Sequence, residues 1–239
     1  MKINIVIVII LIYLTNSAYA HHSREYILLT SFQTGAKGSC LFGLSYDSAS
    51  KNKYYSWETT PAILYSLTNK IMFETHTHFR KEKNIDLLWE AVTFGTQVQL
   101  TNPNSHFLDL GLCFSFETPT SKSRDELSGE NIFGLRLILS KELPYDMNIC
   151  SNVAFTQIIE NKKENYIEFI IGSKKPIISE KLECGIEMLG DFEKGTAINV
   201  LFGLYYSPKD NIIIKSGAGP GLTEKADDNL FSFQIMYNL

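Results

Sequence analysis

The residues best equipped for chemistry lie in the stretch 73–80, where polar and apolar side chains alternate. Its polar members are Glu74, His76, His78 and Arg80. Two imidazoles beside a carboxylate have the donor types that bind a transition metal or assist hydrolysis. In a β-strand all four side chains point to one face, so the alternative is a polar wall with internally paired charges. No third metal ligand is identifiable, and we therefore expect the polar wall, with no cofactor.

The element that must carry this wall is a β-strand, because alternation with a period of two dominates the chain. In 230–239, Phe231, Phe233, Ile235 and Tyr237 alternate with Ser232, Gln234, Met236 and Asn238. A helix cannot keep such apolar residues on one face, whereas a strand does. Twelve segments, each near the ~10 residues that a tilted membrane strand needs, follow this pattern. They are 38–47, 55–66, 70–80, 85–98, 106–117, 130–140, 147–160, 166–173, 181–190, 195–207, 211–217 and 230–239.

The links between these segments predict which end of the molecule faces which side. Tight turns at 66–69, 101–105 and 207–210 would lie at one end, and the long hydrophilic links 118–129 and 218–229 at the other. Short periplasmic turns and long external loops are typical of outer-membrane barrels. The links 141–146 and 174–180 fit less well, because they are long for periplasmic turns.

A soluble β protein also alternates, so aromatic residues must distinguish it from a membrane barrel. Those at or near predicted strand ends are Tyr54, Tyr55, Trp57, Trp89, Tyr145, Tyr166, Tyr205, Tyr206 and Tyr237. Such residues form girdles at both membrane interfaces. The aromatic terminal strand also resembles the signal by which the barrel-assembly machinery recognises its clients. We predict an all-β protein, an antiparallel up-and-down transmembrane β-barrel of about twelve strands in the lipid bilayer of the bacterial outer membrane.

The first twenty residues predict export. Lys2, an apolar run at 3–14 and the small-x-small site Ala18-Tyr19-Ala20 form a secretory signal peptide, the alternative being an uncleaved anchor. We expect a signal peptide at 1–20 and a barrel domain at 21–239. The mature chain would begin His21-His22-Ser23, which could chelate copper or be an incidental start.

Composition and cysteine use narrow the class further. A charged fraction of 20% beside 44% hydrophobic residues excludes a solvated disordered chain, and a net charge of -4 lacks the basic footprint of a nucleic-acid binder. The even cysteine count, Cys40, Cys113, Cys150 and Cys184, permits two disulfides in an oxidising compartment. Each cysteine lies in an alternating apolar segment, so we expect free thiols instead.

Two stretches carry a resemblance to a known family. One runs from Trp57 to Ile71 and contains Thr60-Pro61 and Tyr65-Ser66-Leu67-Thr68-Asn69-Lys70; the other runs from Gly203 to Asn211 and leads to the glycine-rich 217–222. They resemble the outer-membrane β-barrel transporters associated with phenol meta-degradation operons, although Ser66 replaces a glycine of the family pattern. The resemblance implies a barrel and, by analogy, transport. It implies no catalytic residue, and phenolic substrates are not carried over because the family label comes from operon context.

The expected function is a channel or transporter for small solutes. Taking the more polar parity of each strand as inward gives the candidate lumen-lining residues Glu58, Glu74, His76, His78, Arg80, Glu90, Asp109, Glu117, Arg136, Glu168, Glu183, Glu187 and Lys215. Carboxylates dominate this set, so conduction would favour cations or neutral solutes, unless the charges form a closed plug of ion pairs. The alternatives are a structural or surface-interaction protein and a lipid hydrolase. A hydrolase would need a serine near a histidine, and no such arrangement is recognisable within a strand.

Overall fold

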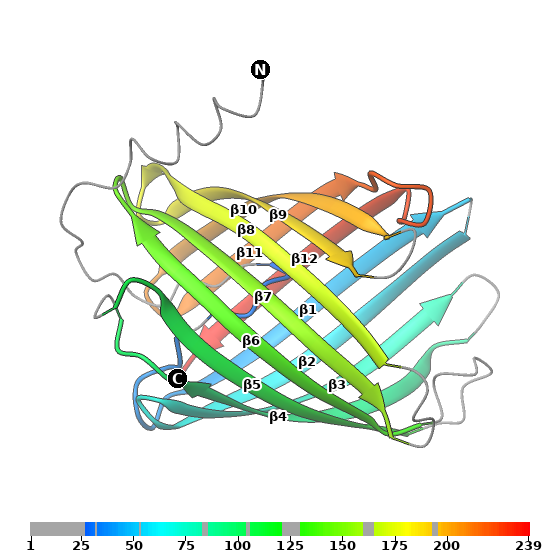
Figure 1. Ribbon diagram of the computed structural model, residues 1–239, viewed down its shortest axis with the longest axis horizontal. Coiled ribbons are helices and arrows are strands. Elements are labelled where there is room, and N and C mark those ends of the chain that lie inside the picture. Colours follow the sequence, from blue (N-terminus) through cyan, green and yellow to red (C-terminus); the bar gives the residue numbers. More distant parts are fainter. Residues whose placement is uncertain are drawn as a thin grey trace.

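The computed structural model describes residues 27–31, 33–52, 54–82, 86–103, 106–120, 130–159, 165–192 and 196–239. They form a closed barrel in which each strand pairs antiparallel with its neighbours in sequence and β1 pairs with β12 (Figure 1). The strands are β1 Cys40–Lys51, β2 Tyr54–Thr68, β3 Ile71–Glu82, β4 Leu88–Gln99, β5 Asp109–Pro119, β6 Ile132–Leu143, β7 Met147–Ile158, β8 Asn165–Ser179, β9 Leu182–Asp191, β10 Ile198–Lys209, β11 Ile212–Pro220 and β12 Asn229–Asn238. The predicted twelve-stranded barrel is confirmed.

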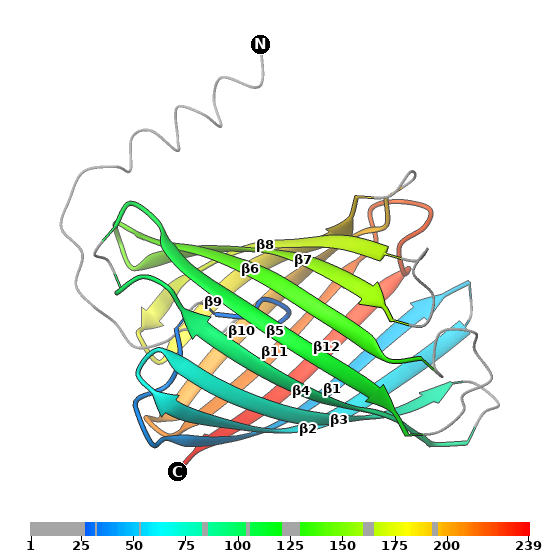
Figure 2. The ribbon, with the colours of Figure 1, turned by 60° about the horizontal axis from the view of Figure 1, so that its bottom comes forward.

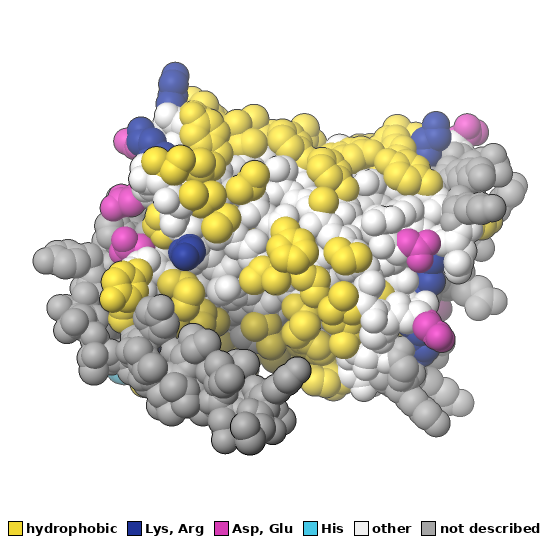
Figure 3. Space-filling view, turned by 90° about the horizontal axis from the view of Figure 1, so that it is seen from above, with side chains coloured by type: hydrophobic (Ala, Val, Ile, Leu, Met, Phe, Trp, Pro, Cys, Tyr) yellow, Lys and Arg dark blue, Asp and Glu magenta, His cyan; other side chains and the backbone are white. Residues whose placement is uncertain are grey.

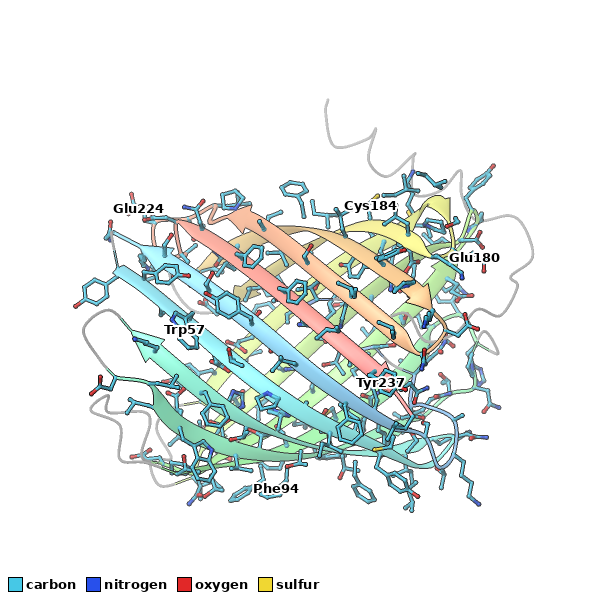
Figure 4. The ribbon with its side chains drawn as sticks, turned by 180° about the vertical axis from the view of Figure 1, so that it is seen from behind. Trp57, Phe94, Glu180, Cys184, Glu224 and Tyr237 are labelled. Carbon is cyan, nitrogen blue, oxygen red and sulfur yellow. The ribbon has the colours of Figure 1, made fainter. Side chains whose placement is uncertain are left out.

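The two links that fitted poorly in the sequence are short in the structure. β8 continues to Ser179, six residues beyond the predicted end at 173, and β6 continues to Leu143. The connections are then the turns 144–146 and 180–181. The predicted end of β8 was wrong because Lys174 and Lys175 interrupt the apolar pattern. Lys174 nevertheless lies on the inward-facing side of the strand. All links at this end, named the turn end, follow even-numbered strands; the other end is the loop end, and Glu180 and Glu224 mark the two ends in Figure 4.

The alternation sorts side chains between two faces as predicted. On β12, Phe233 and Tyr237 are 39% and 43% exposed, whereas Ser232 between strands β1 and β11 is 2% exposed. Apolar side chains cover the middle of the face in Figure 3, and charged ones gather toward its two ends. Phe94, Trp57 and Tyr237 carry the same band around the barrel (Figure 4). Only a lipid environment covers such a continuous apolar surface.

The cysteines and the N-terminal residues were each the subject of a prediction from the sequence. All four cysteines are free thiols, as expected. The predicted signal peptide at 1–20 and the start His21-His22-Ser23 lie outside the described residues. Among the residues that are described, no helix has the length and apolar character needed to cross a membrane.

The interior is more apolar than the polar lining that the sequence predicted. A buried apolar cluster lies inside the barrel and combines Cys113, Ile138, Cys150, Leu201 and Tyr205 of the wall with Ile27 and Leu29. These last two residues precede β1, and the chain that carries them is the dark-blue trace inside the barrel in Figure 2. The core of the molecule is therefore built where the N-terminal segment meets the inner wall.

Candidate functional site: the barrel lumen

Residues 27–31 and 33–36, named here the luminal segment, cross the barrel interior before β1 begins. They lie in the middle of the barrel and in its half toward the turn end, named the inner half. Their hydrogen-bond partners come from the opposite walls β9 and β4 and from strands between them. A chain tied to opposing walls occupies the cross-section of a barrel that is narrow at this strand number.

Glu187, at mid-height on β9, anchors the start of the segment. Its carboxylate accepts hydrogen bonds from the backbone N–H groups of Ile27 at 2.7 Å, Leu28 at 2.7 Å and Leu29 at 3.0 Å. The Tyr205 hydroxyl donates a fourth hydrogen bond at 2.6 Å. Glu187 is only 1% exposed, so these donors replace the water that its charge would otherwise require. The carboxylate predicted to line an aqueous lumen is instead engaged by the protein's own backbone.

Glycines on the wall leave room for the two apolar side chains of the segment. A Cβ atom at Gly217 of β11 would lie 2.8 Å from Cδ1 of Ile27, and one at Gly203 of β10 would lie 2.9 Å from the same atom. At Gly172 of β8, a Cβ atom would lie 2.7 Å from Cδ1 of Leu29. A side chain at any of these positions would force the tip of Ile27 or Leu29 to move, which indicates a wall shaped to receive these two side chains.

The rest of the segment is held by amide side chains. Asn152 of β7 accepts a hydrogen bond from the N–H of Thr30 at 2.7 Å and donates to its carbonyl at 3.1 Å. Gln97 of β4 donates to the carbonyl of Ser31 at 2.7 Å. Across the barrel, Gln234 of β12 donates to the carbonyl of Ile27 at 2.7 Å. Amides suit this role because each can satisfy both N–H and C=O groups of a strandless backbone.

Beside the anchor lies a buried ion pair that the sequence predicted only in part. Lys174 Nζ lies 3.2 Å from Glu183 Oε2, with side chains 2% and 9% exposed, and the same ammonium lies 4.8 Å from the centre of the Tyr205 ring. Lys174 was missed because the predicted strand stopped at 173. The prediction for Tyr205 as an interfacial aromatic residue is wrong: it is 3% exposed in the lumen, while its neighbour Tyr206 is 47% exposed on the outside.

The half of the lumen toward the loop end, named the outer half, has a different chemistry. His78 Nδ1 lies 2.5 Å from Glu58 Oε1, and His78 Nε2 lies 3.2 Å from the Thr93 hydroxyl. Thr93 donates to Glu117 Oε2 at 2.9 Å, and Thr60 donates to the Glu58 carboxylate at 2.9 Å. These contacts form one hydrogen-bonded row across β2, β3, β4 and β5, in which Glu58, His78 and Glu117 retain access to solvent and Thr93 is buried.

A bulge in β4 completes the outer half. The pairing of β3 with β4 shifts so that His78 faces Ala91 and Phe79 faces Trp89, which leaves Glu90 as an extra residue. Glu90 then reaches Arg80, with 3.3 Å between Arg80 Nη1 and Glu90 Oε1. Thr93, further along the same strand, also points inward, toward Glu117. Strict alternation from Glu90 would have turned Thr93 outward, and for this reason the sequence missed it.

The order Glu58–His78–Thr93 resembles an acid, base and hydroxyl triad, but its setting does not favour acyl transfer. The Thr93 hydroxyl is shared with Glu117 and the residue is 4% exposed, so it is poorly placed to attack a substrate. His76 stacks edge-on against His78 at 5.0 Å between ring centres. In the part of the chain that the structure describes, no group of three or more ligating side chains could hold a metal ion.

The remaining predicted residues are dispersed. Arg136 contacts the Thr30 hydroxyl of the luminal segment. Glu74 lies over Gly95 and 3.7 Å from the Cys113 thiol. Asp109 and Lys215 are both 2% exposed, whereas Glu168 is exposed on β8 and faces Asp191 of β9. The thirteen predicted residues therefore do not form one site: the structure brings together Glu58, His78, Arg80, Glu90 and Glu117, with His76 against His78.

Comparisons with known proteins bear on the fold. No family model matches the chain, and no curated protein sequence matches it. Two solved structures, a KdgM porin and a KdgM porin in complex with disordered oligogalacturonate, are similar at TM-scores of 0.59 and 0.58, with 11% and 10% identity. Each similarity covers 82% of this chain and 98% of the other. Outer membrane phospholipase A from Escherichia coli is similar at a TM-score of 0.45 and 9% identity, over 83% of this chain and 92% of that one, which is too weak to bear on function. The chain has the fold of a bacterial outer-membrane β-barrel.

Proposed function

We propose that the protein is an outer-membrane channel for small cationic or neutral solutes. The observation that carries the proposal is the arrangement of the lumen, in which charged side chains with access to solvent line the outer half of a barrel whose outer surface is apolar. A barrel with an apolar exterior and a polar interior is the architecture of outer-membrane channels. The porin fold supports the proposal but supplies no substrate.

The charges of the outer half support a preference for cations. Glu58, Glu90 and Glu117 face Arg80 there, and His78 is the remaining basic group among the residues joined by ion pairs. Carboxylates in a narrow, low-dielectric passage concentrate cations by focusing their field. Oligogalacturonate, named with one similar porin, is a polyanion, and this acidic outer half does not suit it.

The test is single-channel recording of the refolded protein in a planar bilayer. We expect discrete conductance steps and, in a salt gradient, a reversal potential of the sign that cation selectivity gives. Anion selectivity would contradict the charge argument. Liposome swelling with a panel of small uncharged and cationic solutes would then rank substrates by size and charge.

A second candidate, a structural or surface-interaction outer-membrane protein, is favoured by the luminal segment, because a barrel filled by its own chain need not conduct. The absence of conductance in the wild type and in variants designed to release the luminal segment, with normal assembly, would favour it. Turnover of lipid in the same liposomes would favour the lipid hydrolase instead.

We also propose that the chain belongs to the phenol meta-degradation transporter family and that the barrel-assembly machinery inserts it. The first rests on the Trp57–Ile71 and Gly203–Asn211 stretches, which form the β2 strand with its turn and the end of β10 with the turn that follows. Neither adds a substrate.

A further inference from the structure

We propose that the wall of the inner half is a peptide-docking site, that its resident ligand is the luminal segment, and that release of the segment opens the pore. The proposal rests on the channel function proposed above and adds its regulation. The ligand class is an uncharged peptide that bends where it meets the wall and carries aliphatic side chains two residues apart, here Ile27 and Leu29.

The docking site recognises backbone and shape together. Glu187 accepts three successive N–H groups of the segment, which requires no particular side chains on the ligand. Selection comes from the hollows at Gly172 and Gly217, into which the tips of Leu29 and Ile27 fit. Two independent features of the wall, an anion placed for a peptide backbone and hollows placed for side chains, therefore coincide on one segment.

The segment is separable from the barrel that holds it. β1 begins at Cys40, and β1 pairs with β12 from Leu41↔Asn238 to Ser50↔Asn229, so the barrel closes without residues 27–36. Where the structure describes the segment in the middle of the barrel, at residues 27–31, its backbone is hydrogen-bonded to wall side chains and not to the backbone of a strand. An element that closes no strand pair can leave without breaking the sheet.

Undocking would expose a carboxylate and a tyrosine hydroxyl to water, which can solvate both. Glu187 and Tyr205 would join the acidic residues of the outer half along one passage. The docked segment thus removes one carboxylate from the passage and fills its cross-section, and both effects oppose cation flow.

The first experiment measures docking without relying on conduction. The Cys150 thiol is 1% exposed and donates to the Thr30 carbonyl at 3.7 Å, so the segment covers it. Labelling by a membrane-impermeant maleimide, followed by peptide mass spectrometry, should be slow in the wild type and at least tenfold faster in Glu187→Gln. Asp210→Asn removes the same charge at an exposed residue in the turn between β10 and β11 and should label as the wild type does. Equal labelling in all three would overturn the docking site.

A second variant guards against misfolding of Glu187→Gln. The double change Ile27→Ser, Leu29→Ser alters only the segment and should give the same faster labelling of Cys150. Its matched control is Lys37→Ser, because Lys37 is exposed and its contact with Asn69 is made by the backbone N–H.

Single-channel recording of the same variants then separates docking from gating. A larger conductance step in Glu187→Gln and in the double variant, reduced again by an added peptide of residues 27–34, supports the plug. Faster labelling with an unchanged step, in a protein that conducts, overturns the gating role alone. Faster labelling with no conductance in any variant overturns the channel function and the gating role together.

Discussion

The two halves of the lumen hold similar residue types in opposite states. In the inner half, Lys174 and Glu183 pair with side chains 2% and 9% exposed. In the outer half, Arg80 and Glu90 pair with side chains 38% and 19% exposed, and Glu58 and Glu117 remain about one-third exposed. Charges removed from water need a partner of opposite charge, whereas charges that keep solvent need only weak partners.

This difference shows that a count of lumen charges overstates the field in the pore. Glu183 and Glu187 belong to the predicted acidic set, but the first is paired with Lys174 and the second accepts backbone N–H groups. Their charges stabilise the filled half. Selectivity is then expected from the outer half, and the following predictions test whether the division holds.

The largest expected effect is on stability in the inner half. Lys174→Met leaves Glu183 buried without this cation and should lower the free energy of unfolding by about 3–5 kcal/mol. Arg80→Met should cost at most about 1 kcal/mol, because its pair is partly solvated. Denaturant unfolding of the refolded protein, followed by tryptophan fluorescence, measures both. Equal losses would show that the two halves do not differ in solvation.

The apolar cluster gives the next largest effect. Ile138 is 0% exposed and belongs to the cluster that contains Ile27 and Leu29. Ile138→Ala should lower the unfolding free energy by about 2–5 kcal/mol through lost burial and the cavity left behind. Thr60→Ala in the outer half removes one hydrogen bond to Glu58 and should cost about 0.5–1.5 kcal/mol. A smaller loss for Ile138→Ala than for Thr60→Ala would mean that the inner half is loosely filled.

The sequence predicted the wall of this molecule far better than its filling. Strand number, pairing and faces follow from alternation, which is a local pattern. Phe233 and Tyr237 point outward because both occupy the apolar positions of an alternating segment. The luminal segment has no such pattern, and its anchor Glu187 lies 160 residues from Ile27 along the chain. Tyr205 shows the limit clearly, because parity at a strand end cannot distinguish an interfacial ring from one that donates to a buried carboxylate.

A smaller effect is expected on selectivity in the outer half. Glu117→Gln and Glu90→Gln each remove a partly solvated charge, worth up to about 1 kcal/mol for a passing cation, or about fivefold in the permeability ratio. The effect should shrink at high ionic strength, where the Debye length falls to about 3 Å. Asp109→Asn, buried in the inner half, is the matched control and should leave the reversal potential unchanged. A larger shift for Asp109→Asn than for Glu117→Gln would place the selective charges in the wrong half.

The smallest effect is expected at the rim of the outer half, in the link between β11 and β12. Burial, with the nearby Asp228 adding to it and Lys51 opposing it, raises the pKa of the Asp227 carboxyl above its ordinary value. A raised carboxyl pKa means that folding disfavours the ionised form, so this group contributes stability below its ordinary pKa and loses that contribution as the pH rises through the folded-state pKa. Asp227→Asn should therefore stabilise the protein slightly at pH 7, by less than about 0.5 kcal/mol because the site is largely solvated.

The pH dependence of this gain distinguishes it from a loop-packing effect. The Asp227 backbone carbonyl, which accepts a hydrogen bond from Asn199 at 3.2 Å, is retained in Asp227→Asn, so the link keeps that contact with the barrel wall. Below about pH 3, roughly one unit under the ordinary Asp pKa, the wild-type carboxyl is protonated in both the folded and the unfolded state, and the two proteins should then unfold at the same denaturant concentration. A gain that persists at low pH would assign it to packing of the amide. A loss at pH 7 would mean that the ionised carboxylate is favoured at the rim, as in the solvated pairs deeper in the outer half.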